Sequence, residues 1–502
     1  MKLPICVRTS ICSCLLLPAL CIGLITGCSI GPNYHSPRVK TPLSWSAPLA
    51  GGEINGEVAA LTWWKTFNDP CLNSLIDRVV RSNLDLALAS ARVREVRAQY
   101  RIVAAALGPT VGVSGSYAYQ KQSEHQPVIG SLPIPDYVPF ENNFYQAGFD
   151  AAWEIDVFGG TRRAVEAGKA EVAAAELGVQ HVWITLVSEV ARNYVDLRGN
   201  QQLLAISKKN MSAQEQVLAI TRDRFKNGLT TDLDVQQAAT LVATTRSEIP
   251  AFETRIESSI HRLSILMGQP PGALREELSP GSPIPIGSSG VPVGLPSELL
   301  LRRPDIQRAE RQLAATTARI GVATADLFPR FSLTGVAGFQ SVSASDWFTQ
   351  GSSFWSVGPT MQWRIFDSGR IRANIRVQDA RQEQALTAYE QTALNAFEEV
   401  ENSLVAYAKE QERQRALQDA VTSSADSLHL ANQLYTNGLA SFLNVLDAER
   451  SCYRAEEALA HSQARVTQNL IALYKALGGG WQLKLGREPA VARAHIQAVS
   501  LD

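Results

Sequence analysis

The sequence predicts a mixed α and β chain in which two tandem repeats each alternate very long helices with a pair of short strands. Three observations predict this fold class. Residue positions recur in order at a fixed offset, long stretches lack both proline and glycine, and short segments alternate apolar and polar side chains. The 502 residues are 45% hydrophobic and 19% charged, which is too apolar for a disordered chain.

Internal repetition is clearest at the Asn-Gly-Leu triplets that begin at Asn227 and at Asn437, 210 positions apart. Other positions keep the same offset, so that Trp153 has Trp363 as its counterpart. Further upstream the offset grows to 220. Matches that stay in order over this distance indicate the duplication of one unit.

The duplication divides the chain into six segments. They are an N-terminal leader (1–27), an N-terminal extension (28–70), a first repeat (71–268), a linker (269–294), a second repeat (295–478) and a C-terminal tail (479–502). The linker is rich in proline and glycine, which interrupt helices and strands alike. We therefore expect an extended connection between the repeats.

Very long helices are predicted where proline and glycine are scarce. Residues 370–437 contain neither and are rich in Ala, Gln, Glu, Arg and Leu, which favour helix. A continuous helix of that length would measure about 100 Å. Residues 161–227 match this stretch, and second helices are expected at 229–267, kinked at Pro250, and at 439–477. Such lengths predict packed, coiled-coil-like rods; the alternative is a filamentous coiled coil such as an adhesin stalk.

Strands are predicted by period-2 alternation in four segments, near 110–121, 144–156, 331–341 and 354–366. Each has the length of a tilted transmembrane β-strand. One face is apolar, with aromatic residues towards its ends, and the other carries Gly, Ser, Gln, Asp and Glu. This pattern suits a strand between lipid and a watery lumen. The alternative is a half-buried strand of a soluble sheet.

Four strands per chain cannot close a barrel, and lipid does not tolerate an open sheet edge. A dimer would supply eight strands, whose interior is filled by side chains, whereas a trimer would supply twelve and leave a passage. If the protein conducts anything, the sequence therefore predicts a trimeric 12-stranded transmembrane β-barrel. The long α-helices would continue it as a coiled-coil barrel.

The N-terminus has the features of a lipoprotein signal peptide. Lys2 and Arg8 precede a short apolar run, which ends in small residues before Cys28. This end resembles a bacterial lipobox, so we expect cleavage after residue 27 and a diacylglycerol and a palmitoyl chain on Cys28. Ser29 at the next position resembles the pattern that sorts lipoproteins to the outer membrane. The alternative is an ordinary signal peptide with an incidental cysteine.

The remaining sequence contains no catalytic or metal-binding motif. The seven histidines are scattered, and HExxH, CxxC, Walker A and GxGxxG patterns do not occur. The 47 basic and 48 acidic residues nearly cancel, which excludes a large basic surface for nucleic acid. After removal of the leader only Cys71 and Cys452 remain, and the sequence leaves open whether they stay free. We expect no enzymatic activity, no metal and no cofactor besides the lipid.

Several motifs carry a family resemblance. They are Trp63-Trp64-Lys65-Thr66-Phe67-Asn68-Asp69-Pro70, Leu295-Pro296-Ser297-Glu298-Leu299, Arg302-Arg303-Pro304-Asp305 and Tyr474-Lys475-Ala476-Leu477-Gly478. The chain resembles the TolC/OprM-type outer-membrane efflux family, in its NodT-type lipoprotein branch.

The resemblance implies a homotrimer in the outer membrane of a Gram-negative-type bacterium, lipid-anchored, with its helical part in the periplasm. It also implies a passive exit duct for a tripartite efflux pump, with a periplasmic adaptor (membrane fusion) protein and an inner-membrane efflux transporter as partners. The alternative is a structural, periplasm-spanning lipoprotein without a pore. Drugs, aromatic acids, metal ions and proteins are all compatible as cargo.

Two sets of site residues follow from the resemblance. The first is the pair of helix-turn-helix tips that family members present to the adaptor: Asn227, Gly228, Leu229, Asn437, Gly438 and Leu439. Gly228 and Gly438 would also serve as left-handed helix caps.

The second set is a periplasmic gate, which family members narrow with a ring of acidic side chains. Asp447 matches one such position, Asn444 replaces its acidic companion, and Asp234 matches the acid of the first repeat. A carboxylate repeated by threefold symmetry would attract cations. The alternative is an acid that stabilises the first turn of a helix.

Overall fold

The computed structural model describes residues 29–47, 53–54, 62–121, 123, 140–287 and 291–479. The predicted leader, Cys28 and all of the C-terminal tail after residue 479 lie outside the described residues. The chain divides into two compact units. The first comprises Met1–Pro37, Arg94–Ala173 and Glu310–Thr387, and the second comprises Arg38–Val93, Ala174–Ala309 and Ala388–Asp502.

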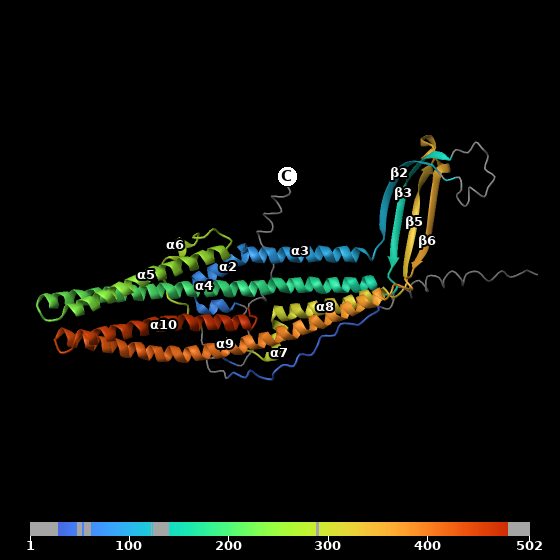
Figure 1. Cartoon of the computed structure of the whole chain (residues 1–502). Helices are drawn as coiled ribbons and strands as arrows, with labels where there is room; N and C mark the ends of the chain where they lie inside the picture. Colours follow the sequence, from blue (N-terminus) through green and yellow to red (C-terminus); the bar gives the residue numbers. More distant parts are fainter. Residues whose placement is uncertain are drawn as a thin grey trace, which may run out of the picture. The chain divides into compact units, whose positions relative to one another are not determined.

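A four-stranded antiparallel sheet dominates the first unit (Figure 1). Its strands are β2 (Thr110–Lys121), β3 (Glu141–Ile155), β5 (Arg330–Ser341) and β6 (Ser353–Gln362), in the order β2-β3-β5-β6. All four predicted strands are present. β6 ends before the expected residue 366 because its partner β5 begins at Arg330, which pairs with Gln362.

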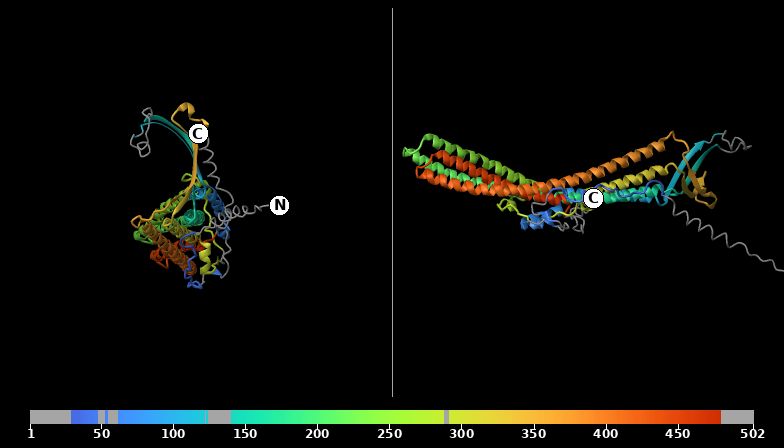
Figure 2. Two further views of the ribbon diagram at one scale, coloured as in Figure 1. Left: turned by 90° about the vertical axis from the view of Figure 1, so that its right-hand side faces the viewer. Right: turned by 90° about the horizontal axis from the view of Figure 1, so that it is seen from below.

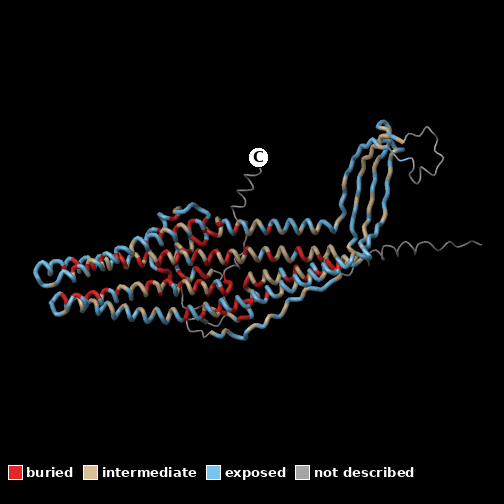
Figure 3. Tube along the Cα trace, viewed as in Figure 1, coloured by how far each residue is buried: buried red, intermediate tan, exposed pale blue. Residues whose placement is uncertain are grey.

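The register of the sheet aligns the apolar positions of all four strands. Val113 pairs with Phe149, Phe149 with Ala337, and Ala337 with Trp355, which makes one row across the sheet. Because side chains at paired positions point to the same face, the alternating patterns combine into one continuous apolar surface. In the isolated chain much of this surface is exposed (Figure 3).

In the described part of the chain, six long helices occur as three pairs of equal length. α3 (Leu84–Ala105) and α8 (Pro304–Ala325) have 22 residues each, and α4 (Gly160–Lys226) and α9 (Arg370–Thr436) have 67 each. α5 (Asp232–Leu266) and α10 (Phe442–Ala476) follow with 35 each. Equal lengths at the offsets found in the sequence confirm the internal duplication. Pro250 lies inside α5, which continues through it.

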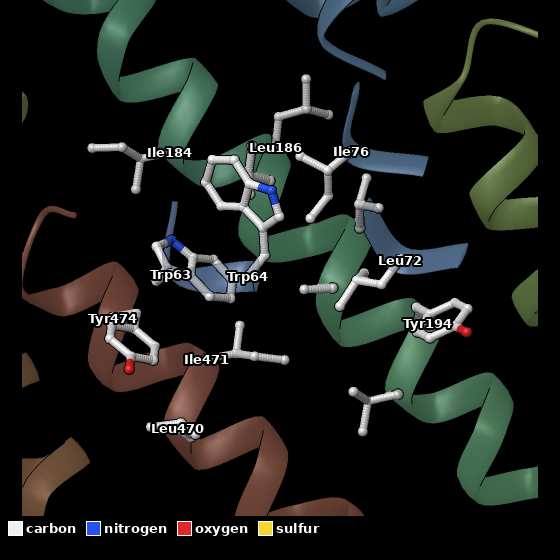
Figure 4. Close-up of a cluster of buried hydrophobic side chains, with 14 of the residues drawn as sticks. Trp63, Trp64, Leu72, Ile76, Ile184, Leu186, Tyr194, Leu470, Ile471 and Tyr474 are labelled. Carbon is white, nitrogen blue, oxygen red and sulfur yellow. The ribbon is translucent and has the colours of Figure 1, made fainter. Parts of the chain in front are cut away.

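The main hydrophobic core lies in the second unit (Figure 4). It forms where the 3₁₀-helix η1 (Trp63–Phe67) and α2 (Pro70–Ser82) pack on α4 and α10. The Trp63 ring stacks on Tyr474, with ring centroids 5.3 Å apart, and the Tyr194 hydroxyl donates to Asp69 at 2.8 Å. The Trp-Trp motif and the final helix are therefore parts of one core.

The Arg-Pro-Asp motif of the second repeat is also structural. The buried Arg303 donates to Asp305 at 2.6 Å, to Glu399 at 2.7 Å and to the carbonyl of Ala476 at 3.0 Å. These bonds connect the start of α8 with α9 and with the end of α10. Burial acts to raise the pKa of Asp305, but the Arg303 guanidinium outweighs it and holds that pKa below its usual value.

The linker is less extended than its proline and glycine content suggests. It contains the short helix α6 (Arg275–Leu278) and the strand β4 (Val291–Pro292), which pairs in parallel with β1 (Glu53–Ile54). Leu278 and Ile284 are buried in the core, so the linker packs on the second unit rather than leaving it. Three shorter helices complete the described elements: α7 (Pro296–Arg302), η3 (Ala344–Asp346) and η4 (Gln350–Ser352).

Cys71 and Cys452 are both free thiols. None of the described helices combines the length and the hydropathy needed to cross a membrane.

Candidate functional site

The two predicted tips are sharp turns between long helices. Gly228 has φ of +70° and Gly438 has φ of +76°, a backbone region that residues with a side chain rarely adopt. The amide of Leu229 donates to the carbonyl of Arg224 at 2.9 Å, and that of Leu439 to Leu434 at 2.8 Å. These are the bonds of a Schellman cap, which ends a helix and satisfies its last carbonyls.

The tips present apolar side chains to solvent. Leu229 is 64% exposed and Leu439 is 75% exposed. The side-chain amides of Asn227 and Asn437 each donate to the backbone carbonyl four residues earlier, at 2.8 and 2.9 Å. The asparagines therefore close the last helical turn, and the leucines are the side chains that the turn leaves available.

Next to the turns, the α4–α5 and α9–α10 hairpins lie side by side and pack together (Figure 2). Leu218 and Val235 of the first hairpin share one cluster with Tyr435, Phe442 and Leu446 of the second. This cluster, here called the tip core, holds the two hairpins in one register and so fixes the positions of the predicted gate residues.

Asp234 and Asn444 occupy equivalent places, in the first turns of α5 and α10. The carboxylate of Asp234 accepts hydrogen bonds from Thr230 and from the amide and hydroxyl of Thr231, which completes a capping box. Partial burial acts to raise the pKa of Asp234, but these hydrogen bonds outweigh it and hold that pKa below its usual value. At α10 the cap residue Ser441 makes no side-chain capping bond.

Asp447 lies one turn beyond Asn444, and both side chains are exposed. Because they are three residues apart in a helix, they share one face of α10. The structure therefore brings Asn444 and Asp447 together, whereas Asp234 belongs to the other hairpin and is used as a cap. The gate itself stays a prediction, since it would form only between chains.

One feature that the sequence did not predict is the packing of the residues directly after Cys28 on the first unit. Residues 29–36, here called the strap, lie in the first unit against the start of α4 and along α8. The Arg163 side chain, 4% exposed, donates to the carbonyls of Ile30 at 3.1 Å and Gly31 at 3.2 Å and to Asn33 Oδ1 at 2.7 Å.

Close backbone contact continues the strap. Gly31 has φ of +91°, and a Cβ added there would lie 2.5 Å from Cα of Gly321. Further along, Tyr34 and Ser36 donate to Glu310 at 2.9 and 3.0 Å. One signal was present in the sequence: at the offset of 210, the counterpart of Arg163 is Ala373, so this arginine is not part of the repeated pattern.

Among the residues that the structure describes, no group of three or more His, Cys, Asp or Glu side chains is arranged to hold a metal ion.

Comparison with known proteins identifies the family. The profile of the family described as "Outer membrane efflux protein" matches residues 75–269 and 295–479. Nodulation protein T of Rhizobium leguminosarum bv. trifolii is 32% identical over 463 residues, which covers 91% of this chain and 96% of that protein. The solvent efflux pump outer membrane protein SrpC of Pseudomonas putida is 32% identical over 472 residues, covering 93% and 98%.

Among solved structures, the outer-membrane channel OprN superposes with a TM-score of 0.84 at 36% identity, covering 91% of this chain and 100% of that one. The family profile matches both repeats, and the relatives extend over almost the whole sequence. The chain therefore belongs to the outer membrane efflux protein family and acts as an exit duct in the outer membrane.

Proposed function

We propose that three copies of the chain join edge to edge into a 12-stranded barrel in the outer membrane, continued into the periplasm by their helical hairpins. The sheet supports this arrangement. In the described part of the chain, the outer edges of β2 and β6 have no partner strand, and the apolar rows run across all four strands. Lipid requires both edges to be paired, and a twelve-stranded trimer leaves a passage where an eight-stranded dimer would be filled by side chains.

Cys28 is the proposed anchor, carrying a diacylglycerol and a palmitoyl chain. The packing of Ser29, the residue that follows Cys28, is compatible with this assignment. Ser29 lies directly against Gly159, where an added Cβ would be 2.8 Å from Cα of Ser29. The lipid would therefore be held close to the first unit, which carries the membrane-facing sheet, instead of at the end of a loose tether.

The tips are the proposed contact with a periplasmic adaptor, which connects the duct to an inner-membrane efflux transporter. Their exposed leucines and rigid caps support this role. The duct would conduct passively, and the transporter would select the cargo. SrpC is named for solvent efflux and a relative of equal similarity for nodulation, which fits a duct that does not itself determine the cargo.

Asp447 is the proposed gate acid. In a closed trimer three copies of it would approach the threefold axis and attract cations. Planar-bilayer recordings test the duct and the gate together. We expect the wild type to show a small, cation-preferring conductance, and Asp447→Ala to raise the conductance while weakening the cation preference.

Asn444→Ala is the matched control, because an amide has no net charge and its removal should change ion selectivity less. Wild-type conductance and selectivity in Asp447→Ala would show that Asp447 is only a helix-start acid. Complete electrical silence, even after the tip acids are neutralised, would instead favour the structural lipoprotein without a pore.

A further inference from the structure

A buried carboxyl group lies inside the periplasmic tip, on the opposite side of α10 from the proposed gate acid. Glu449 follows Asp447 by two residues, a rotation of about 200° around the helix. Asp447 is exposed, whereas Glu449 is only 7% exposed. Within the described part of the chain, Glu449 has neither a hydrogen-bond partner nor an ion-pair partner.

Two side-chain bonds set the register between α4 and α10 at this level. The hydroxyls of Ser207 and Tyr453 are 3.0 Å apart, and Asn210 donates to Glu456 at 3.1 Å. α4 runs towards the tip and ends at Lys226, whereas α10 begins at Phe442 and runs away from it, so the two helices are antiparallel. Moving towards the tip therefore raises the residue number on α4 and lowers it on α10.

Gln214 is the α4 residue that this register places at the level of Glu449. The Ser207–Tyr453 bond would place residue 211 opposite Glu449, and the Asn210–Glu456 bond would place residue 217 there; Gln214 lies midway between them. Gln214 is 5% exposed, and its Oε1 is a buried acceptor without a donor in the described structure. Glu449 and Gln214, two buried residues with polar groups that lack partners, thus lie at about the same level along the hairpins. This level is next to the tip core, on the side away from the turns.

The surroundings offer Glu449 no compensating charge. Burial alone raises the pKa of Glu449 to about 7. By the bonds between the helices, the titratable and charged groups within about one turn of this level are Glu215 on α4, Arg246 and Glu248 on α5, Asp426 and His429 on α9, and Arg450, Cys452 and Tyr453 on α10. Glu215 is paired with Arg246 at 2.8 Å, and Glu248 accepts from Tyr453. An ionised Glu449 would therefore be an unpaired buried charge, which is costly.

We propose that Glu449 and Gln214 form a proton-controlled latch, in which the protonated carboxyl donates to Gln214 Oε1 and holds α10 against α4. Loss of the proton leaves a buried charge, which is relieved when α10 moves away from α4 and water reaches the carboxylate. The periplasmic tip is therefore packed more tightly in mild acid than at neutral or alkaline pH. The consequence for conduction rests on the proposed function, because only a duct has a gate at its tip.

The direction of the pH effect follows from proton linkage. An acid whose pKa is raised when it is buried keeps its proton in the packed tip at pH values where the opened tip has lost it. The packed form is then most favoured below 4.5, the ordinary pKa of a glutamate, and its population falls as the pH rises towards about 7, the raised pKa of Glu449. With one proton involved, the ratio of packed to open tips changes at most about tenfold per pH unit in this window.

Hydrogen exchange of the full-length protein in lipid nanodiscs tests the latch. We expect amides of residues 442–456, after correction for intrinsic exchange, to lose protection by up to about a hundredfold between pH 5 and pH 7. Glu449→Gln, a neutral isostere that keeps a donor, should stay protected at both pH values. Gln214→Leu, which removes the acceptor, should lower the protection at pH 5.

Glu457→Gln is the matched control, because Glu457 lies on the same helix with a more exposed side chain and should leave the wild-type pH dependence intact. A pH-independent wild type, or a Glu449→Gln variant that keeps the wild-type pH dependence, would overturn the latch. Conductance measured beside hydrogen exchange separates the two proposals. A conducting channel whose exchange does not depend on pH contradicts only the latch. A protein that does not conduct, but whose exchange depends on pH, contradicts only the duct.

Discussion

At the scale of single residues, the two tips differ in how their second helices begin. Asp234 completes a capping box at α5, whereas Asn444 at the equivalent position of α10 does not. We expect Asn444→Asp to complete the box with Ser441 and to stabilise the first turn of α10 by about 0.5–1 kcal/mol. Amide exchange of residues 441–445 measures this effect, and the added carboxylate should also increase cation preference. Unchanged protection would show that another feature prevents the cap.

The converse change removes an existing cap. Asp234→Ala should expose the first turn of α5 and cost about 1 kcal/mol. Because the hydrogen bonds lower the pKa of Asp234, the stability that they supply is present above its usual pKa and is lost as the pH falls below it. The mutational difference measured by exchange at pH 7 should therefore shrink below about pH 4. A difference that persists in strong acid would contradict the capping role.

Arg163 is the residue on which the strap depends most. Arg163→Ala removes the guanidinium's three hydrogen bonds to the strap, as well as its ion pair with Glu166, and leaves two backbone carbonyls unsatisfied, a local cost on the order of 3 kcal/mol. We expect proteases to cleave within residues 29–36 of this variant much faster than in the wild type. Arg372→Ala is the control, at an exposed arginine in the first turn of α9. Proteases should cleave its strap at the wild-type rate. Equal cleavage rates in both variants would show that the glycine contacts hold the strap without Arg163.

At the scale of elements, the sheet depends on glycine where β3 meets β5. Gly148 pairs with Gly338, and a Cβ added to Gly338 would overlap the carbonyl oxygen of Ala147. A Cβ added to Gly335, which lies between β3 and β6, comes no closer than 3.7 Å to its neighbours. We expect Gly338→Ala to reduce assembled protein in the membrane severalfold and Gly335→Ala to leave it unchanged, as measured by heat-resistant oligomer on gels. Equal yields would mean that the strands can shift to accept the methyl group.

The sequence predicted the elements well because their signals are local. Alternation marked the strands, the scarcity of proline and glycine marked α4 and α9, and Gly228 and Gly438 marked the turns. The strand end at Gln362 was missed because it depends on where the partner strand begins. The packing of the linker was missed for a similar reason: Leu278 and Ile284 are few among prolines and glycines, yet they reach the core.

At the scale of the whole molecule, the duplication gives the chain its elements, and departures from the duplication mark its special positions. Arg163 corresponds to Ala373, Glu449 corresponds to Ala239, and Asp234 corresponds to Asn444. A core position that is alanine in one repeat and charged in the other needs a local reason, which pattern reading alone does not provide. The contacts of the strap and the tip supply that reason, because only one repeat receives the N-terminus and only one hairpin carries the latch acid.

The anchor is the last feature that acts on the whole assembly. Because one cysteine would carry all of the lipid, Cys28→Ser should leave the precursor unacylated, which mass spectrometry of the purified protein detects. The strap and the sheet remain in this variant, so twelve strands should still insert in part of the population. We therefore expect a partial loss of export, measured as intermediate resistance to a cargo of the pump. A variant that is still acylated would refute the lipobox, and complete loss of export would show that the lipid is required for assembly.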